Sequence, residues 1–143
     1  MEQLVISPAE WRVMRIAWSK KAVTSKEVEA LLAPATGWKV ATVKTLLRRL
    51  VQKGALATER QGRAFVYRPQ VGEQETINQA VEDLFASICQ MRAGAALVDV
   101  VDQIPLSKQD IASLQAALNR RAATAPERVT CNCLPDETDC DCD

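Results

Sequence analysis

The sequence lacks histidine altogether and is poor in aromatic residues, with three tryptophans, two phenylalanines and one tyrosine among 143 residues. Histidine is the side chain most often used for acid–base catalysis near neutral pH. The sequence also contains no glycine-rich phosphate loop and no serine in a nucleophile elbow. We therefore expect that the protein is not an enzyme.

Long apolar runs are absent as well. No stretch approaches the roughly 18 apolar residues of a transmembrane helix. Residues 1–4 carry no basic segment ahead of an apolar one, as a secretory signal would. We expect a cytoplasmic protein with no membrane partner. Thiols stay reduced in the cytoplasm, so the five cysteines favour a metal site over a disulfide framework.

The net charge of zero conceals an asymmetry between the two halves of the chain. Residues 1–70 hold 13 Lys and Arg against 5 Asp and Glu, whereas residues 71–143 hold 5 against 13. A basic half followed by an acidic half indicates one end that binds nucleic acid and one end that does not. An uneven distribution by chance is the alternative.

Capping signals mark the first two predicted helices. Ser7 is the N-cap of the first, and Glu10 follows three residues later to complete a capping box. The second helix begins in the same way at Thr24, and we expect Pro34 and Gly37 to end it. Both helices carry apolar residues at helical spacing, which indicates that one face of each is buried.

A third helix and a hairpin follow. The third helix is predicted over about 41–53, with Gly54 as its stop. Two short strands are predicted over 56–60 and 63–68, joined by a tight turn at Gln61–Gly62. Three helices followed by a two-stranded ribbon predict a winged helix-turn-helix domain.

The C-terminal half is helical again. We expect one helix over 73–91, a shorter one over 94–103 and a last one that begins at the cap Ser107. Helices this short rarely bury all their apolar stripes within one chain, so we expect a dimer; packing on the winged domain is the alternative. The predicted fold is mainly α with a small β-hairpin, divided into a winged-helix DNA-binding domain (1–70), a helical dimerisation domain (71–122) and a linker with a cysteine-rich metal-binding tail (123–143).

The third helix carries the candidate DNA-reading side chains. Lys44 and Arg48 lie one turn apart, with Thr45 and Arg49 beside them. Such a face can contact phosphates and base edges when the helix enters the major groove of double-stranded DNA. A solvated basic face is the alternative, but the capped helices, the wing and the basic charge together favour DNA binding. The predicted DNA-binding residues are Lys39, Thr42, Lys44, Thr45, Arg48, Arg49, Arg60 and Arg63.

The remaining feature is a tail with two Cys-x-Cys pairs, Cys131 with Cys133 and Cys140 with Cys142. Residues i and i+2 of an extended backbone point the same way, so each pair offers two sulfurs to one ion. Four thiolates suit one tetrahedral Zn(II), and they also suit Cu(I) at low coordination number. The fifth cysteine, Cys89, lies in an apolar run, and we expect it to be a small core or interface residue.

The first helix and the third helix resemble a known family. Residues 7–14, Ser-Pro-Ala-Glu-Trp-Arg-Val-Met, resemble the opening of the penicillinase-repressor family of winged-helix regulators. Residues 42–50, followed by Lys53 and Gly54, resemble that family's recognition helix. The resemblance implies a homodimeric repressor on an inverted-repeat operator, with the C-terminal helices forming the dimer.

The tail resembles that of the copper-transport repressor, or CopY-type, subfamily. This resemblance implies that Cys131, Cys133, Cys140 and Cys142 bind Zn(II) or Cu(I). It also implies that the zinc form binds the operator, that Cu(I) releases it, and that a copper chaperone is a further partner. One departure is the spacer of six residues, 134–139, where the subfamily has four. The longer loop costs little closure entropy, so chelation is expected to survive it.

Two alternative functions stay open. One is a metal-buffering or metallochaperone protein that uses its winged helix for protein contact. The other is a β-lactamase-type repressor with an added metal tail. A metal buffer would show no salt-dependent DNA affinity, whereas a repressor that contacts several phosphates weakens steeply as salt rises.

Overall fold

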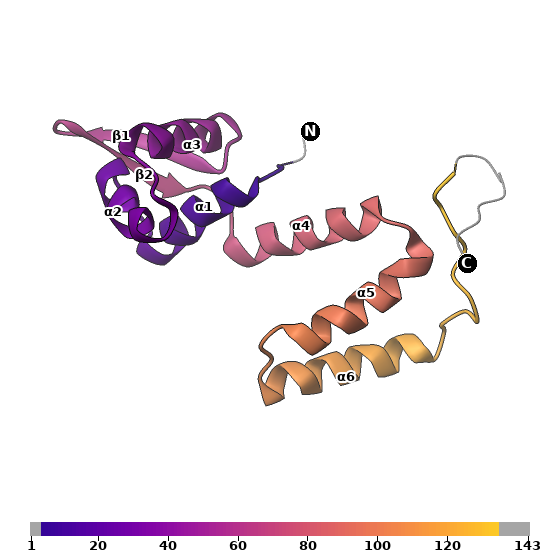
Figure 1. Cartoon of the computed structure of the whole chain (residues 1–143). Coiled ribbons are helices and arrows are strands. Elements are labelled where there is room, and N and C mark those ends of the chain that lie inside the picture. Colours follow the sequence, from indigo (N-terminus) through magenta and orange to yellow (C-terminus); the bar gives the residue numbers. More distant parts are fainter. Residues whose placement is uncertain (1–3, 135–143) are drawn as a thin grey trace. The chain divides into compact units, whose positions relative to one another are not determined.

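The computed structural model describes residues 4–134 of the chain. These residues form six helices and one two-stranded antiparallel sheet (Figure 1). The mainly helical fold with a small hairpin is therefore confirmed. The chain divides into two compact units, Met1–Ala80 and Val81–Asp143. No helix in the described part is both long enough and apolar enough to cross a bilayer.

The first unit opens with α1 (Pro8–Lys20), α2 (Ser25–Thr36) and α3 (Val40–Gln52). The predicted capping box of α1 is confirmed: the Glu10 N–H donates to Ser7 Oγ at 3.2 Å, and the Ser7 N–H donates to the Glu10 carboxylate at 2.9 Å. Thr24 caps α2, because its hydroxyl oxygen accepts from the Glu27 N–H at 3.2 Å. These caps satisfy amides that the first turn of a helix leaves without partners.

The end of α2 differs from the prediction at one residue. Gly37 ends the helix in the left-handed conformation, at φ 71°, as expected. Pro34, however, lies inside α2 and does not end it. The last carbonyls still find donors, because the Thr36 hydroxyl donates to Leu32 O at 2.8 Å and the Gly37 N–H donates to Ala33 O at 2.8 Å.

The wing is a hairpin of β1 (Leu56–Gln61) and β2 (Ala64–Pro69), with Gln61 opposite Ala64. The residues between the strands are Gly62 and Arg63, so the predicted turn at Gln61–Gly62 was wrong by one position. Gly62 adopts φ 62°, and a two-residue hairpin turn needs such a left-handed residue at its first central position. Arg63 therefore belongs to the turn and not to the second strand.

Two long-range contacts hold the hairpin against the helices. Val23, just before α2, pairs with Tyr67 of β2 through hydrogen bonds of 3.0 and 2.8 Å. The Trp18 indole N–H donates to the carbonyl of Val71 at 2.9 Å, just beyond the hairpin. The wing is thus fixed relative to α1 and to the start of α2.

The core of the first unit lies between its helices and the start of β1. The inner face of α3 contributes most, because Val43, Leu47 and Leu50 have no exposed surface. Burying each leucine is worth about 1.5–3 kcal/mol. This burial fixes the rotation of α3 about its axis. The other buried apolar residues of this cluster are Val13, Met14, Ala17, Val23, Val28, Leu32, Leu46, Ala55 and Leu56.

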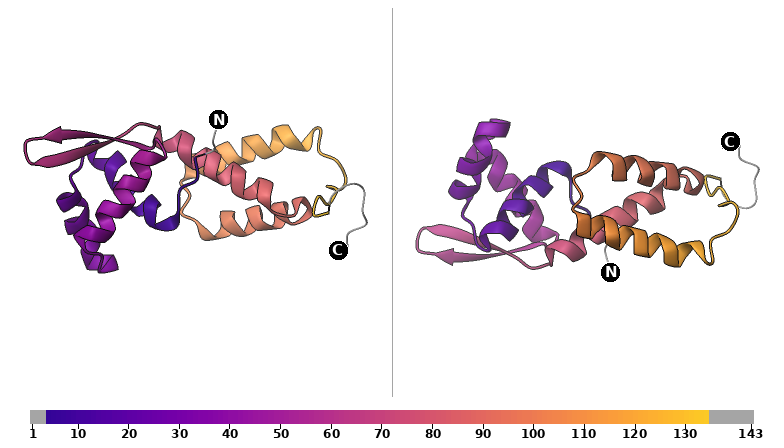
Figure 2. Two further views of the ribbon diagram at one scale, coloured as in Figure 1. Left: turned by 90° about the horizontal axis from the view of Figure 1, so that it is seen from above. Right: turned by 90° about the horizontal axis from the view of Figure 1, so that it is seen from below.

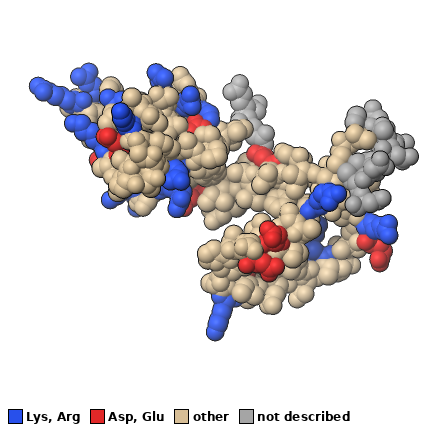
Figure 3. All heavy atoms as spheres, viewed as in Figure 1, with Lys and Arg blue, Asp and Glu red and all other residues tan. Residues whose placement is uncertain are grey.

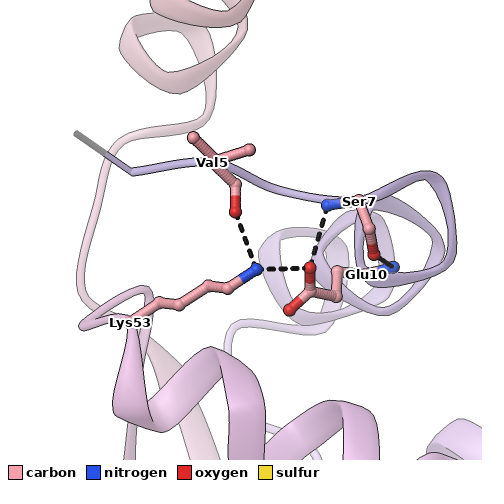
Figure 4. Close-up of polar contacts among 4 residues, drawn as sticks. All are labelled: Val5, Ser7, Glu10 and Lys53. Carbon is pink, nitrogen blue, oxygen red and sulfur yellow. Dashed lines mark hydrogen bonds and ion pairs between the residues drawn. The ribbon is translucent and has the colours of Figure 1, made fainter.

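A buried carboxylate joins the beginning of α1 to the end of α3 (Figure 4). Glu10 is only 2% exposed, and its Oε1 lies 2.6 Å from Nζ of Lys53, the C-cap of α3. The same Nζ donates to the carbonyl of Val5 at 2.7 Å. Burial alone would raise the pKa of Glu10, but the hydrogen bonds from Lys53 and Ser7 outweigh it and hold the pKa below its ordinary value.

The second unit contains a helix break that the sequence did not predict. α4 (Glu73–Ser87), which begins in the first unit, ends before Ile88, and α5 (Gln90–Gln103) begins after Cys89. The expected helices over 73–91 and 94–103 were therefore wrong in their boundary. The Gln90 side chain donates to the carbonyls of Phe85 at 3.0 Å and Ile88 at 3.3 Å, which satisfies acceptors at the end of α4.

The last helix, α6 (Lys108–Ala122), begins as predicted. Ser107 and Asp110 form a reciprocal capping box with two hydrogen bonds of 3.0 Å. Hydrogen bonds from the backbone N–H and the hydroxyl of Ser107 to the carboxylate lower the pKa of Asp110.

None of the residues of α4, α5 and α6 is buried. Exposed apolar side chains along three consecutive helices are typical of an association surface. The predicted limits of the dimerisation domain and the tail stay predictions. The more exposed of these large apolar side chains are Val81, Leu84, Met91, Leu97, Val98, Ile104, Ile111 and Leu118.

We expect Glu10→Gln to lower the free energy of unfolding by about 1–3 kcal/mol at neutral pH, because Lys53 and Ser7 lose a charged acceptor. The pKa of Glu10 is lower in the folded protein than in the unfolded chain. Its stabilising contribution is therefore present above the unfolded pKa and is lost as the pH falls through the folded pKa. Urea titrations at neutral pH and in acid should show a smaller loss on acidification for Glu10→Gln than for the wild type. The exposed Glu59→Gln is the control, and an equal effect there would contradict the role of the buried pair.

Candidate DNA interface and metal centre

The outer face of α3 carries cations because its inner face is committed to the core. Lys44 and Arg48 are exposed, on the side away from the buried Leu47. Thr45 is half-buried, and its hydroxyl donates to Ala41 O at 3.0 Å, so its position relative to the helix is fixed. Two cations one turn apart are thus held on a rigid helix.

A groove runs between this face of α3 and the wing. Lys44, Thr45 and Arg48 line it on one side, and Arg63 at the turn of the hairpin lines it on the other. The structure therefore brings four of the predicted DNA-binding residues together. Lys and Arg side chains crowd the face of the first unit that Figure 3 shows. A cationic groove beside a projecting helix suits the phosphates that flank a major groove.

The beginning of α2 also lines this groove, which the sequence analysis missed. Thr24, Ser25 and Lys26 lie on its wall. The N-terminus of a helix presents backbone N–H groups and a partial positive charge, which favour a phosphate. The Thr24 cap was visible in the sequence, but its nearness to α3 depends on tertiary packing. Gln61, next to the turn, lines the groove as well.

The other predicted DNA-binding residues lie outside the groove lining. Lys39 is the exposed N-cap of α3, Thr42 is exposed in its first turn, and Arg49 is exposed on another side of that helix. Arg60 is exposed at the end of β1, where its Nε donates to Gly62 O at 3.2 Å and braces the turn. These four residues stay predicted DNA contacts.

Three cysteine sulfurs of the second unit lie close together. The Sγ atoms of Cys89, Cys131 and Cys133 are all within 4.8 Å of one another, and the Cys89 and Cys131 sulfurs are 3.8 Å apart. This separation is much longer than the roughly 2.05 Å of a disulfide bond. Cys140 and Cys142 lie outside the described residues, so their predicted role as ligands stays a prediction.

Hydrogen bonds hold this cysteine cluster against the beginning of α5. The Gln90 N–H donates to the Asn132 side-chain carbonyl at 3.0 Å, and the Cys133 N–H donates to Cys131 Sγ at 3.4 Å. Figure 2 shows the tail returning to the junction of α4 and α5 in two views. Thiolates without hard oxygen donors form a ligand set for Cu(I) or Zn(II).

Cys89 does not belong to the buried core, which was one of the two positions that the sequence analysis expected for it; the other, an interface, stays a prediction. It is only half-buried, and it occupies the N-cap position of α5. No local signal separates it from the apolar run around it. Its role depends on the helix break and on a contact with residues 42 positions further along the chain.

Three helices, a hairpin wing and a cationic outer face on the third helix define a winged-helix DNA-binding protein. The profile of the family described as "Penicillinase repressor" matches residues 6–120. The chain belongs to this family of transcriptional repressors.

The chain is also similar to individual proteins. A Latilactobacillus sakei protein, described as an uncharacterized 16.5 kDa protein in the ptsI 3′ region, is 46% identical over 136 residues, which cover 95% of this chain and 93% of that protein. The penicillinase repressor of Bacillus licheniformis is 29% identical over 113 residues, covering 79% and 88%. A solved structure of a repressor named CopR has 47% identity and a TM-score of 0.42, covering 48% of this chain and 99% of that one.

We expect Arg48→Ala to weaken binding to duplex DNA and to reduce the slope of log affinity against log salt by about one, because one phosphate contact is lost. Fluorescence anisotropy across a salt series measures both quantities. Arg15→Ala is the matched control, because Arg15 is an exposed arginine of the same unit that lines a different hollow, on α1. Equal effects of the two substitutions would contradict the interface.

Proposed function

We propose that the protein is a copper-responsive transcriptional repressor of copper-transport genes. A homodimer binds an inverted-repeat operator in the zinc form and leaves it when Cu(I) occupies the C-terminal thiolates. The observation that carries the proposal is the presence, in one repressor chain, of a winged-helix domain and a cluster of cysteine sulfurs. The winged-helix domain binds DNA, and the cysteine sulfurs bind the metal ion that controls this binding.

The DNA-binding step rests on the groove of the first unit. α3 enters the major groove, so that Lys44 and Arg48 contact base edges and phosphates. Arg63, at the turn of the wing, contacts the DNA backbone. The beginning of α2, which lines the same groove, binds a phosphate through its backbone N–H groups. Two such domains in a dimer read half-sites about 34 Å apart, one turn of DNA.

The homodimer rests on the apolar surface of the second unit. Each helix leaves a large apolar side chain exposed: Leu84 of α4 is 60% exposed, Val98 of α5 64% and Leu118 of α6 61%. A second copy of the chain offers the same apolar surface and can bury both, as in isologous interfaces. Dimer formation sets the distance between the two winged domains.

The switch requires that the metal bind two forms of the dimer with different free energy. Structural Zn(II) sites hold four ligands in a tetrahedron, whereas Cu(I) accepts fewer thiolates. The sulfurs of Cys131, Cys133, Cys140 and Cys142 therefore adopt different arrangements in the two forms. Because the tail follows α6, this rearrangement changes the helices of the dimer, and the winged domains lose their one-turn spacing. A copper chaperone is the proposed donor of Cu(I).

One observation favours a second candidate function. The family match ends at residue 120, before the first cysteine pair. A β-lactamase-type repressor with an added tail that stores metal without controlling DNA fits this limit. In that protein, operator binding would be independent of Cu(I).

We expect Cu(I) to release the zinc form of the wild type from the operator but to leave operator binding by the double variant Cys131→Ser/Cys133→Ser unchanged. The variant lacks two of the four thiolates and cannot form the same copper site. A gel-shift titration with Zn(II) and then Cu(I) measures the difference. Release of the double variant by Cu(I) would contradict the switch, and resistance of the wild type would favour the second candidate.

We expect Leu84→Lys/Leu118→Lys to shift the dimer towards monomer, because charges would replace two leucines that the proposed dimer buries. Analytical ultracentrifugation over a concentration series measures the dissociation constant. The winged domain should remain folded, since neither residue belongs to its core. Gln115→Lys adds a charge at an exposed polar position of α6 and serves as control. A double variant that remains dimeric would exclude these leucines from the interface.

A further inference from the structure

We propose that Cys89 is a fifth metal ligand, which binds Cu(I) together with Cys131 and Cys133 at the beginning of α5. This inference rests on the proposed function, because it places the copper site of the same switch on a helix of the second unit. It adds a ligand from outside the tail.

The distances between the sulfurs fit one ion. The Cys89 and Cys131 sulfurs are 3.8 Å apart, and the third sulfur lies within 4.8 Å of both. Metal–sulfur bonds of about 2.3 Å separate two thiolates by about 3.8 Å in tetrahedral and 4.0 Å in trigonal geometry. Only small side-chain rotations are needed to close this cysteine cluster on a metal.

A hydrogen bond joins the backbone of α5 to the segment that carries the two tail cysteines. Asn132, the residue between the two tail cysteines, accepts a hydrogen bond from the first amide of α5, that of Gln90, at 3.0 Å. The Cys133 N–H donates to Cys131 Sγ at 3.4 Å, as amides do around metal-bound thiolates. Because the Gln90–Asn132 hydrogen bond holds Cys131 and Cys133 beside Cys89, it lowers the entropy cost of closing the three sulfurs on one metal.

The position of Cys89 suits a negatively charged ligand set. Cys89 is the N-cap of α5, where the helix dipole is positive. Three thiolates and one Cu(I) leave a net charge of −2, which this dipole stabilises. The cluster is also accessible, because Cys89 and Cys131 are half-buried and Cys133 is exposed.

The number of sulfurs selects the metal. Cu(I) is satisfied by three thiolates, whereas a structural zinc site requires a fourth ligand. Among the described residues, the cysteine cluster supplies three. Zinc would need a further sulfur from Cys140 or Cys142, so the two metals engage the tail and the α4–α5 junction differently. Cys89 thereby gives Cu(I) a direct connection to the helices of the proposed dimer.

Cu(I) competition with the chelator bathocuproine disulfonate tests the ligand in the reduced, full-length protein. Cys89→Ser should weaken Cu(I) binding by about tenfold or more, since losing even an outer-sphere partner costs a metal site this much. Ala86→Ser is the matched control, because it adds a hydroxyl to an exposed site in the same segment and keeps all five thiols. Circular dichroism verifies that both variants are folded.

A second measurement uses the wild type and so does not depend on the folding of a variant. Iodoacetamide alkylation, followed by mass spectrometry, gives the reaction rate of each cysteine with and without Cu(I). Cu(I) should protect Cys89 together with Cys131 and Cys133. The inference is overturned if Cys89 reacts at the same rate in both conditions, or if Cys89→Ser binds Cu(I) as tightly as Ala86→Ser.

Operator binding separates this inference from the proposed function. If Cu(I) protects Cys89 but does not release the wild type from DNA, the ligand assignment stands and the copper switch fails. If Cu(I) releases the wild type while Cys89 stays unprotected, the switch stands and the fifth ligand is excluded.

Discussion

Burial of the inner face of α3 is the constraint on which the first unit depends. Val43, Leu47 and Leu50 have no exposed surface, so the helix has a single rotation about its axis. That rotation turns Lys44 and Arg48 outward, and the same packing brings α2 and the wing to either side of them. Lys53, at the C-terminal end of α3, is held by the buried Glu10 carboxylate. The geometry of the DNA interface is thus a consequence of the apolar core beneath it.

The second unit has the opposite character, because its helices leave their apolar side chains exposed. Its well-defined local structure comes from caps and short-range hydrogen bonds, such as the Ser107–Asp110 box and the Gln90 side chain at the end of α4. In the proposed dimer, such helices gain most of their stability from packing that a second chain supplies. A unit whose stability depends on association can be controlled by a ligand. A difference of a few kcal/mol in the ligand's binding free energy between two forms of the dimer shifts the equilibrium between them.

Several elements could be predicted because their signals are local. The caps at Ser7, Thr24 and Ser107 were confirmed, since each involves a side chain and an amide three residues away. The predicted positions of the wing turn and of one helix boundary were wrong, because neighbouring residues carry turn or helix signals of similar strength. The wing turn shifted by one residue because Gly62 takes the first turn position, and the helix over 73–91 broke because Gln90 offers the α4 carbonyls another donor.

The same distinction between local and long-range determinants applies to the candidate DNA interface and the cysteine cluster. The sequence by itself determined which residues can bind DNA or a soft metal, because residue type and helical spacing decide the chemistry and the face on which it lies. Only the tertiary structure decided which of these residues lie close together in space. The beginning of α2 joined Lys44, Arg48 and Arg63 in one groove, and Cys89 joined Cys131 and Cys133 in one cluster. Both groups form through contacts between segments that are distant in the sequence. Tertiary packing offsets the entropy cost of bringing these segments together, and local sequence patterns do not predict that packing.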